Sequence, residues 1–131
     1  MILRHVVASI IMLVLDTCFI YNITARMYKP MVTKIQGRKA NYRPLFGILA
    51  YMGMLLGLNL FVIPNIKESS RWTDSLIYGG GYGLSTFAMY SFTAMTVFSD
   101  WSIAVALTET CWGAFVFAAS AAASSYVSTG L

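Results

Sequence analysis

The sequence predicts an all-α membrane protein: an antiparallel bundle of four transmembrane helices, with a short basic segment at the membrane surface between the first two. Of the 131 residues, 58% are hydrophobic and 11% are charged, whereas roughly 25% are charged in an average soluble domain. So short a chain has much surface for its volume, and nine basic and five acidic residues are too few to cover that surface in water. The composition excludes a soluble monomer, a disordered chain and a disulfide-stapled secreted domain.

Four apolar runs are each long enough to cross a bilayer as a helix, which takes about 20 residues. They cover about residues 6–25, 45–63, 75–97 and 102–127. A helix satisfies its own backbone hydrogen bonds in lipid, and the alternation typical of barrel strands is absent. Short polar connections place consecutive helices antiparallel, so residues 1–131 are expected to form a single integral membrane domain.

The first connection holds six of the nine basic residues, namely Arg26, Lys29, Lys34, Arg38, Lys39 and Arg43. The positive-inside tendency predicts that this loop is cytosolic and that both termini lie on the opposite side. Met27, Met31 and Ile35 recur every four residues, and Pro30 suits the first turn of a helix. We expect a basic amphipathic helix lying on the membrane, in contact with anionic lipid headgroups. The alternative is a contact surface for an acidic protein or for nucleic acid, of which nucleic acid is the less expected partner.

Two acidic residues lie inside the predicted spans. Asp16 lies about 15 Å into the first span, and Glu109 lies about 10 Å into the fourth from the side where the first span ends. Their depths therefore differ by only about 5 Å. Ser91 of the third span falls in the same layer, with Thr93 close by. The sequence predicts a buried polar layer formed by these four residues.

This polar layer has three interpretations. A carboxylate near the membrane midplane costs about 2.5–3.5 kcal/mol on insertion scales and usually faces a partner or a cavity. The first interpretation is structural, with a neutral carboxyl donating a hydrogen bond across the bundle. The second is a proton relay or cation site, and the third is a catalytic acid pair.

Small residues recur at spacings that allow helices to approach closely. They are Gly53 and Gly57 in the second span, Gly79 and Gly83 in the third, and Ala114, Ala118 and Ala122 in the fourth. We expect these residues to pack helices within one chain, with homo-oligomer formation as the alternative.

Several segments, in order along nearly the whole chain, resemble an uncharacterised family of small membrane proteins, domain of unknown function 2177. Leu15-Asp16-x-x-Phe19-Ile20 is similar to the family's Leu-Asp-x-x-Trp-Leu-Gly, and Thr108-Glu109-Thr110-Cys111-Trp112-Gly113 to its Val-Asp-x-x-Trp-Gly. Further matches are Met27-Tyr28-Lys29, the stretch from Tyr51 to Val62, Gly83, Tyr90-Ser91-Phe92-Thr93 and Trp101.

The departures from the family pattern concern the acidic groups. Ser91 and Ala94 stand where the family has Asp and Asn, and Glu109 stands where it has Asp. If the family's acids form a shared site, this chain has lost one of three acidic groups, which favours a structural layer over an ion site. The resemblance carries no established activity. The family occurs in bacteria and large DNA viruses, which implies the internal membrane of a virion as one setting.

The function expected from the sequence is therefore a structural or assembly role in a membrane, without enzymatic activity, cofactor or metal. The alternative is a small transporter or channel for protons, cations or a solute that uses Asp16 and Glu109. There is no Walker loop, nucleophile elbow or His-Glu-x-x-His pair, so no catalytic residue is predicted.

Overall fold

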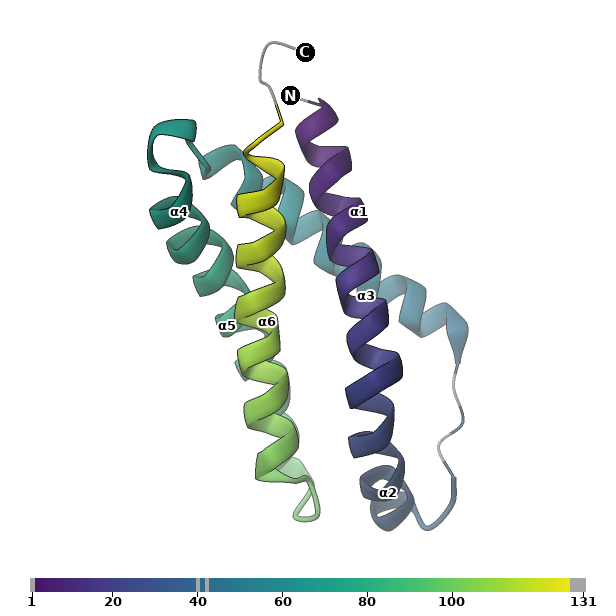
Figure 1. The fold of residues 1–131 in the computed structure, drawn as a ribbon. Coiled ribbons are helices and arrows are strands. Elements are labelled where there is room, and N and C mark those ends of the chain that lie inside the picture. The colour runs from purple at the N-terminus through teal and green to yellow at the C-terminus, as the bar shows by residue number, and fades with distance from the viewer. Residues whose placement is uncertain (1, 40, 42, 128–131) are drawn as a thin grey trace.

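The protein is built from helices, as the sequence predicts. The structure, a computed structural model, describes residues 2–39, 41 and 43–127. Among these residues, three helices are long and apolar enough to cross a membrane, namely Ile2–Gln36, Pro44–Asn65 and Ile103–Ser124 (Figure 1). The fourth helical segment, residues 71–97, covers the predicted third span but contains many Gly, Ser, Thr and Tyr residues and is not among these three.

The first long helix runs unbroken through α1 (Ile2–Phe19), the π-helical turn η1 (Ile20–Thr24) and α2 (Ala25–Gln36). It ends where Gly37 adopts a left-handed φ of 75°, a conformation that glycine reaches without steric cost. The predicted short basic helix is present as α2 and continues directly from the first span. The expected place of Pro30 in its first turn is wrong, because Pro30 lies inside α2. An interior proline removes a hydrogen bond and crowds the carbonyl four residues earlier, yet the chain remains helical on both sides of Pro30.

The second long helix comprises α3 (Pro44–Gly57), η2 (Leu58–Val62) and η3 (Ile63–Asn65). Pro44 occupies its first turn, where a missing N–H donor is harmless. Figure 1 shows α3 crossing the bundle obliquely, with its first half apart from the other helices. Residues 44–50 are all exposed, so this half of α3 has no packing partner in the described chain.

The remaining helices form the closest pair in the bundle. After the short turn η4 (Glu68–Ser70), α4 (Arg71–Asp74), η5 (Ser75–Gly80) and α5 (Gly81–Val97) run antiparallel to α6 (Ile103–Ser124). The Ser102 hydroxyl caps α6 by accepting hydrogen bonds from the backbone N–H groups of Ala104 (3.1 Å) and Val105 (3.4 Å).

Three of the four predicted packing glycines lie against another helix. A Cβ at Gly57 would collide with the Tyr82 side chain, and one at Gly83 would collide with the Gly113 carbonyl. A Cβ at Gly79 would lie 2.9 Å from the Phe117 carbonyl oxygen and 3.0 Å from Cα of Ala118. Gly53 differs, because a Cβ there would have no neighbouring atom within 4 Å. It therefore makes no close packing contact with the described residues.

Ala114 and Ala118 lie on the side of α6 that faces η5. A Cβ built at Gly80 would lie 3.9 Å from both the Ala114 carbonyl oxygen and the Ala118 Cβ. Both alanines are half-buried, whereas Ala122, one turn further on, is buried. These small side chains allow the two helices to approach each other closely.

The hydrophobic core occupies the half of the bundle nearer the chain ends. Its buried members are Ala8, Met12, Leu58, Val62, Ile63, Ile66, Val116, Phe117 and Ala121. The second long helix therefore joins the core only through its second half. The first half of α3 is left free of the bundle.

At this end of the bundle, two arginines form hydrogen bonds between segments that are distant in the sequence. Arg4 is only 6% exposed and donates hydrogen bonds to the carbonyl oxygens of Ile66 (3.1 Å) and Ser125 (3.3 Å). Arg71 donates to the same Ser125 oxygen at 3.2 Å. The last carbonyls of a helix lack partners and carry partial negative charge, so both guanidinium groups stabilise the end of α6.

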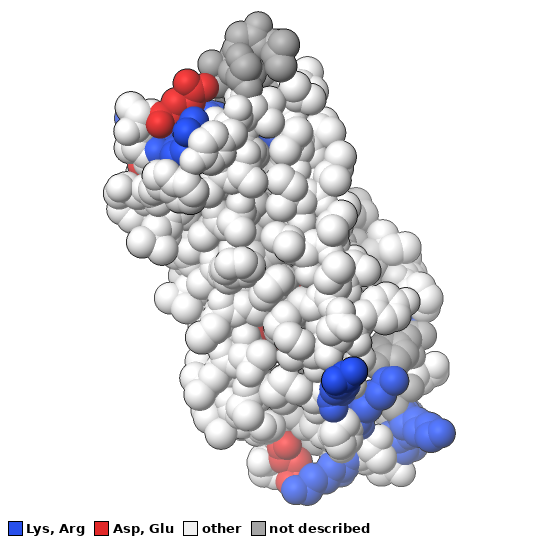
Figure 2. Space-filling view, viewed as in Figure 1, with Lys and Arg blue, Asp and Glu red and all other residues white. Residues whose placement is uncertain are grey.

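The opposite end of the molecule is basic (Figure 2). The six basic residues of the first connection are all exposed. Lys34 lies 3.5 Å from Asp100, which belongs to the turn before α6. Contact between this end and anionic lipid remains a prediction.

Candidate functional site

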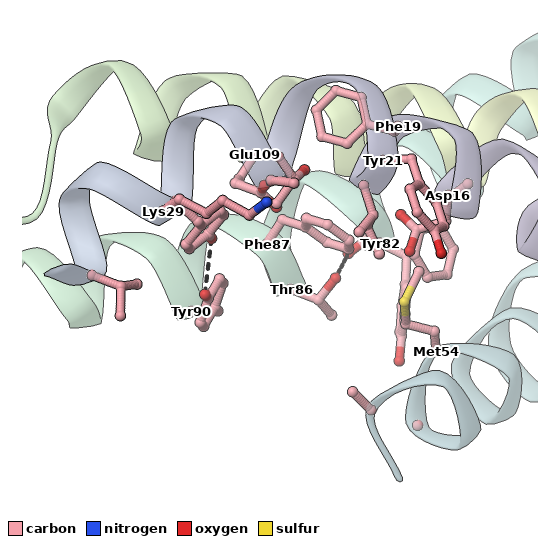
Figure 3. A pocket seen from close by; sticks show the side chains of 18 residues that line it. Asp16, Phe19, Tyr21, Lys29, Met54, Tyr82, Thr86, Phe87, Tyr90 and Glu109 are labelled. Atoms are coloured by element: carbon pink, nitrogen blue, oxygen red, sulfur yellow. Dashed lines mark hydrogen bonds between the residues drawn. The ribbon is translucent and has the colours of Figure 1, made fainter. Parts of the chain in front are cut away.

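A groove of about 1000 Å³ opens where the first half of α3 leaves the bundle. The first long helix, α3, α5 and α6 all contribute to its walls, which are mostly apolar. Figure 3 shows Asp16 towards one end of the groove and Glu109 with Lys29 towards the other. Both acids of the predicted polar layer therefore line one cavity.

Asp16 is held in place by an aromatic neighbour from α6. The Trp112 indole Nε1–H donates a hydrogen bond of 2.8 Å to Oδ1 of Asp16, whose residue is 6% exposed. The Trp112 ring in turn stacks on Phe19, with ring centroids 4.2 Å apart and planes 4° apart. The carboxyl therefore has a fixed orientation and a neutral partner.

Glu109 is held by the first long helix. The Thr24 hydroxyl donates a hydrogen bond of 3.2 Å to Oε1 of Glu109, which is 9% exposed. Glu109 also lies within electrostatic range of Asp16. In the described part of the chain, the pair Lys34–Asp100 is the only ion pair within 4 Å, so neither carboxyl in the groove has a cationic partner.

An aromatic cluster bounds the groove at its basic end. The hydroxyl groups of Tyr28 and Tyr90 share a hydrogen bond of 2.9 Å, drawn in Figure 3. Both rings meet Trp101 edge-on, at centroid distances of 5.6 Å and 6.0 Å. Lys29 also lines the groove at this end and is the only basic residue among the described residues of its walls.

Two members of the predicted polar layer lie elsewhere. Ser91 is fully buried, but its hydroxyl has no hydrogen-bond partner in the structure and does not line the groove. Thr93 is exposed and thus lies outside any buried layer. The structure brings Asp16 and Glu109 to one cavity and leaves both hydroxyl residues outside it.

Sequence reasoning missed the hydrogen-bond donors that hold the two acids. Trp112 gave a signal, because it lies in the middle of a span, away from the span ends where aromatic residues usually gather. Thr24 gave no such signal, since a threonine near the end of an apolar run is common. Lys29 was assigned to the lipid surface, and its place in the groove follows only from the continuous first helix.

A family model matches residues 1–126 and carries the description "predicted membrane protein (DUF2177)". The chain belongs to the DUF2177 family. Its placement in a membrane agrees with the three span-length helices. The description of the family names no activity, substrate or partner. No curated protein and no solved structure matches the chain.

In this DUF2177 protein the groove provides charge, hydrogen bonding and apolar surface together. Thr24 and Trp112 each bond one oxygen of their carboxyl, and the Tyr51 hydroxyl of α3 also lies within hydrogen-bonding reach of Asp16. No group of three or more His, Cys, Asp and Glu side chains that would hold a metal ion occurs within that described set. The arrangement is suited to binding a proton or a positively charged group.

Proposed function

We propose that this protein is a small membrane transporter that binds a proton or a cation at Asp16 and Glu109. One observation carries the proposal: two buried carboxyl groups from different helices line one groove, without a cationic side chain within 4 Å of either. Intramembrane acids that face a cavity commonly mark ion pathways and proton relays.

The donors to the two acids support a binding role over a purely structural one. Trp112 and Thr24 are neutral donors, so they orient the carboxyl groups without neutralising an ionised form. An ionised acid costs about 2.5–3.5 kcal/mol at the membrane centre. A bound proton or cation removes this charge, and the site is therefore suited to exchanging one for the other.

A structural or assembly role is the second candidate, and one observation favours it. Residues 44–50 of α3 are all exposed and have no packing partner in the described chain. A helix of another protein, or of a second copy, would find a free surface there. The internal membrane of a virion remains a setting implied only by the occurrence of the family in large DNA viruses.

The test is ion flux across vesicles that contain the purified protein. Wild-type protein is expected to carry protons when a potassium diffusion potential is imposed. A pH-sensitive dye trapped inside the vesicles reports the change in internal pH. Asp16→Asn and Glu109→Gln are each expected to abolish this flux, because neither amide exchanges a proton. Asp100→Asn serves as the control, because Asp100 is an exposed acid outside the groove.

The result has a direct interpretation. Flux that is lost in the two groove variants and kept in Asp100→Asn supports transport. Absence of flux from the wild-type protein overturns the proposal and leaves the assembly role. Circular dichroism of each variant separates a lost function from a lost fold.

A further inference from the structure

We infer that the groove binds a lipophilic organic cation, a molecule with one positive charge on a largely apolar or aromatic body. This inference names the ligand class of the site above and rests on the proposed function. It follows from the size of the groove, the composition of its walls, its charge and its opening.

The size and walls of the groove fit an organic molecule. Its volume of about 1000 Å³ lies at the upper end of the range of about 300–1000 Å³ found for small-molecule sites. The apolar walls come from every side of the bundle, with Phe19, Ile20, Val32, Met54, Phe87 and Phe117 among them. A bare ion would leave most of this surface without contacts.

The net charge of the groove favours a ligand that carries a single positive charge. The two carboxyls and Lys29 are its ionisable carboxylate and ammonium groups, so acids exceed bases by one when all are ionised. The hydrogen-bond donors, Trp112 to Asp16 and Thr24 to Glu109, are neutral and leave the formal charge of the two acids uncompensated. One monovalent cation in the groove would bring this formal charge to zero.

The chemistry of the walls argues against a hard metal ion. Ca²⁺ takes six to eight oxygen ligands, and Mg²⁺ demands near-ideal octahedral geometry. The groove offers two carboxyl groups from different helices, and no metal-binding group of three acidic, His or Cys side chains occurs among residues 2–39, 41 and 43–127. Four tyrosines line the groove instead, and aromatic faces attract organic cations. These tyrosines are Tyr21, Tyr28, Tyr82 and Tyr90.

The opening of the groove fits a ligand that dissolves in the bilayer. Ala50 and Gly53 form the α3 wall together with Met54, so two of these three α3 residues have little or no side chain. A Cβ at Gly53 would meet no other atom within 4 Å. Since the first half of α3 is separate from the bundle, a lipophilic molecule can enter sideways from the hydrocarbon region.

Tetraphenylphosphonium is a suitable probe, because it carries one delocalised charge inside an aromatic shell. Its binding to the wild-type protein in detergent is measured by equilibrium dialysis, with protein-free micelles as the blank. Asp16→Asn and Glu109→Gln are each expected to weaken binding by about 30-fold or more, as loss of one partner of a desolvated charge pair does. Asp100→Asn is expected to bind as the wild type does.

A matched pair of glycines tests the position of the ligand. Gly53 and Gly47 lie on the same helix, and neither has a neighbouring atom within 4 Å of a built Cβ. Only Gly53 lines the groove. Gly53→Leu is therefore expected to weaken binding by about tenfold, and Gly47→Leu to leave it unchanged, while both variants fold.

A second matched pair tests the charge balance. Lys29 and Lys34 are both exposed on α2, but only Lys29 lines the groove. Lys29→Gln removes the positive charge that competes with the ligand, so binding is expected to tighten by several fold. Lys34→Gln is expected to have no effect on binding.

The possible results separate this inference from the proposed function. Proton flux without probe binding overturns the ligand class and leaves transport intact. Probe binding without flux keeps the ligand class and overturns transport. Equal binding by Gly53→Leu and Gly47→Leu places the probe outside the groove and overturns the inference.

Discussion

Trp112 of α6 donates its indole N–H to the Asp16 carboxyl of α1 at 2.8 Å and so joins the first and last long helices across the bundle. The same indole ring stacks on Phe19, one turn further along the first helix. One side chain thus fixes the orientation of a buried acid and adds aromatic contact between the helices.

Trp112→Phe removes the hydrogen bond and keeps an aromatic ring for the stack on Phe19. We expect the free energy of unfolding to fall by about 1–2 kcal/mol, because Asp16 loses its donor in a site of low polarity. Titration of detergent-solubilised protein with a denaturing detergent measures this change. Trp72→Phe is the control, since Trp72 is 65% exposed. A Trp112→Phe variant as stable as the wild type would show that the ring alone holds the helices together.

The contact between α5 and α6 at Gly83 predicts that replacement by alanine has very different effects on stability at Gly83 and at Gly53. A Cβ at Gly83 would collide with the Gly113 carbonyl, which belongs to a helical backbone and cannot move alone. Gly83→Ala is expected to destabilise the protein by about 1–3 kcal/mol or more. Gly53→Ala is expected to be neutral or to stabilise it by up to about 1 kcal/mol, because its Cβ would meet only open space. Equal effects of the two changes in the same unfolding assay would contradict the packing described.

Arg4 is expected to contribute strongly to stability although it is a charged residue in an apolar bundle. Arg4→Met keeps the length of the side chain and removes both hydrogen bonds, to Ile66 and to Ser125. We expect a loss of about 2–4 kcal/mol, because hydrogen bonds to charged groups contribute about 1.5–3 kcal/mol each. Arg38→Met, a change at an exposed position, should cost almost nothing. The comparison fails if both variants unfold at the same denaturant concentration.

The hydrogen bonds where the turn η4 enters α4 predict a dependence of stability on pH. Hydrogen bonds from the Ser70 hydroxyl (2.6 Å) and the Lys67 backbone N–H (2.9 Å) hold the pKa of Asp74 below its ordinary value of 3.8. A carboxyl whose pKa is lowered on folding stabilises the folded state above its unfolded pKa. This contribution is lost as the pH falls through the folded pKa.

The variant Asp74→Asn isolates this contribution. The difference in unfolding free energy between wild type and variant should be constant above about pH 5 and should shrink as the pH falls below 3.8. Hydrogen exchange of the backbone amides in residues 66–74 measures the effect locally. A difference that keeps its size at the lowest pH tested would rule out the ionised carboxyl as its source.

That Asp16 and Glu109 come to one groove agrees with counting along two apolar runs, since helices have a fixed rise per residue. The faces of the helices could not be predicted in this way. Counting depth says nothing about rotation. Thr93 lies only two residues from the buried Ser91, but two residues correspond to about 200° around a helix, and Thr93 therefore faces outward.

Local signals also misplaced the end of the first helix. Pro30 and the cluster of basic residues resembled the start of a separate surface helix. In the structure the chain remains helical to Gln36, although an interior proline disfavours a helix. The stop signal is Gly37, with its left-handed φ.

The groove itself was beyond sequence reasoning. It exists because the first half of α3 is inclined away from helices that pack closely elsewhere. The apolar run of residues 45–63 predicts a helix of the right length, but every apolar helix in lipid has that pattern. The tilt of a helix depends on its neighbours, and the sequence did not reveal that α3 has so few.

The isolation of α3 links the protein to the thickness of the bilayer around it. The helix Pro44–Asn65 has 22 residues and is about 33 Å long, slightly more than the roughly 30 Å of a typical hydrocarbon layer. A helix that exceeds this thickness tilts to fit. Its second half is fixed in the core, so a shorter lipid chain acts mainly on the free half. We therefore expect the width of the groove to vary with the acyl-chain length of the surrounding lipid.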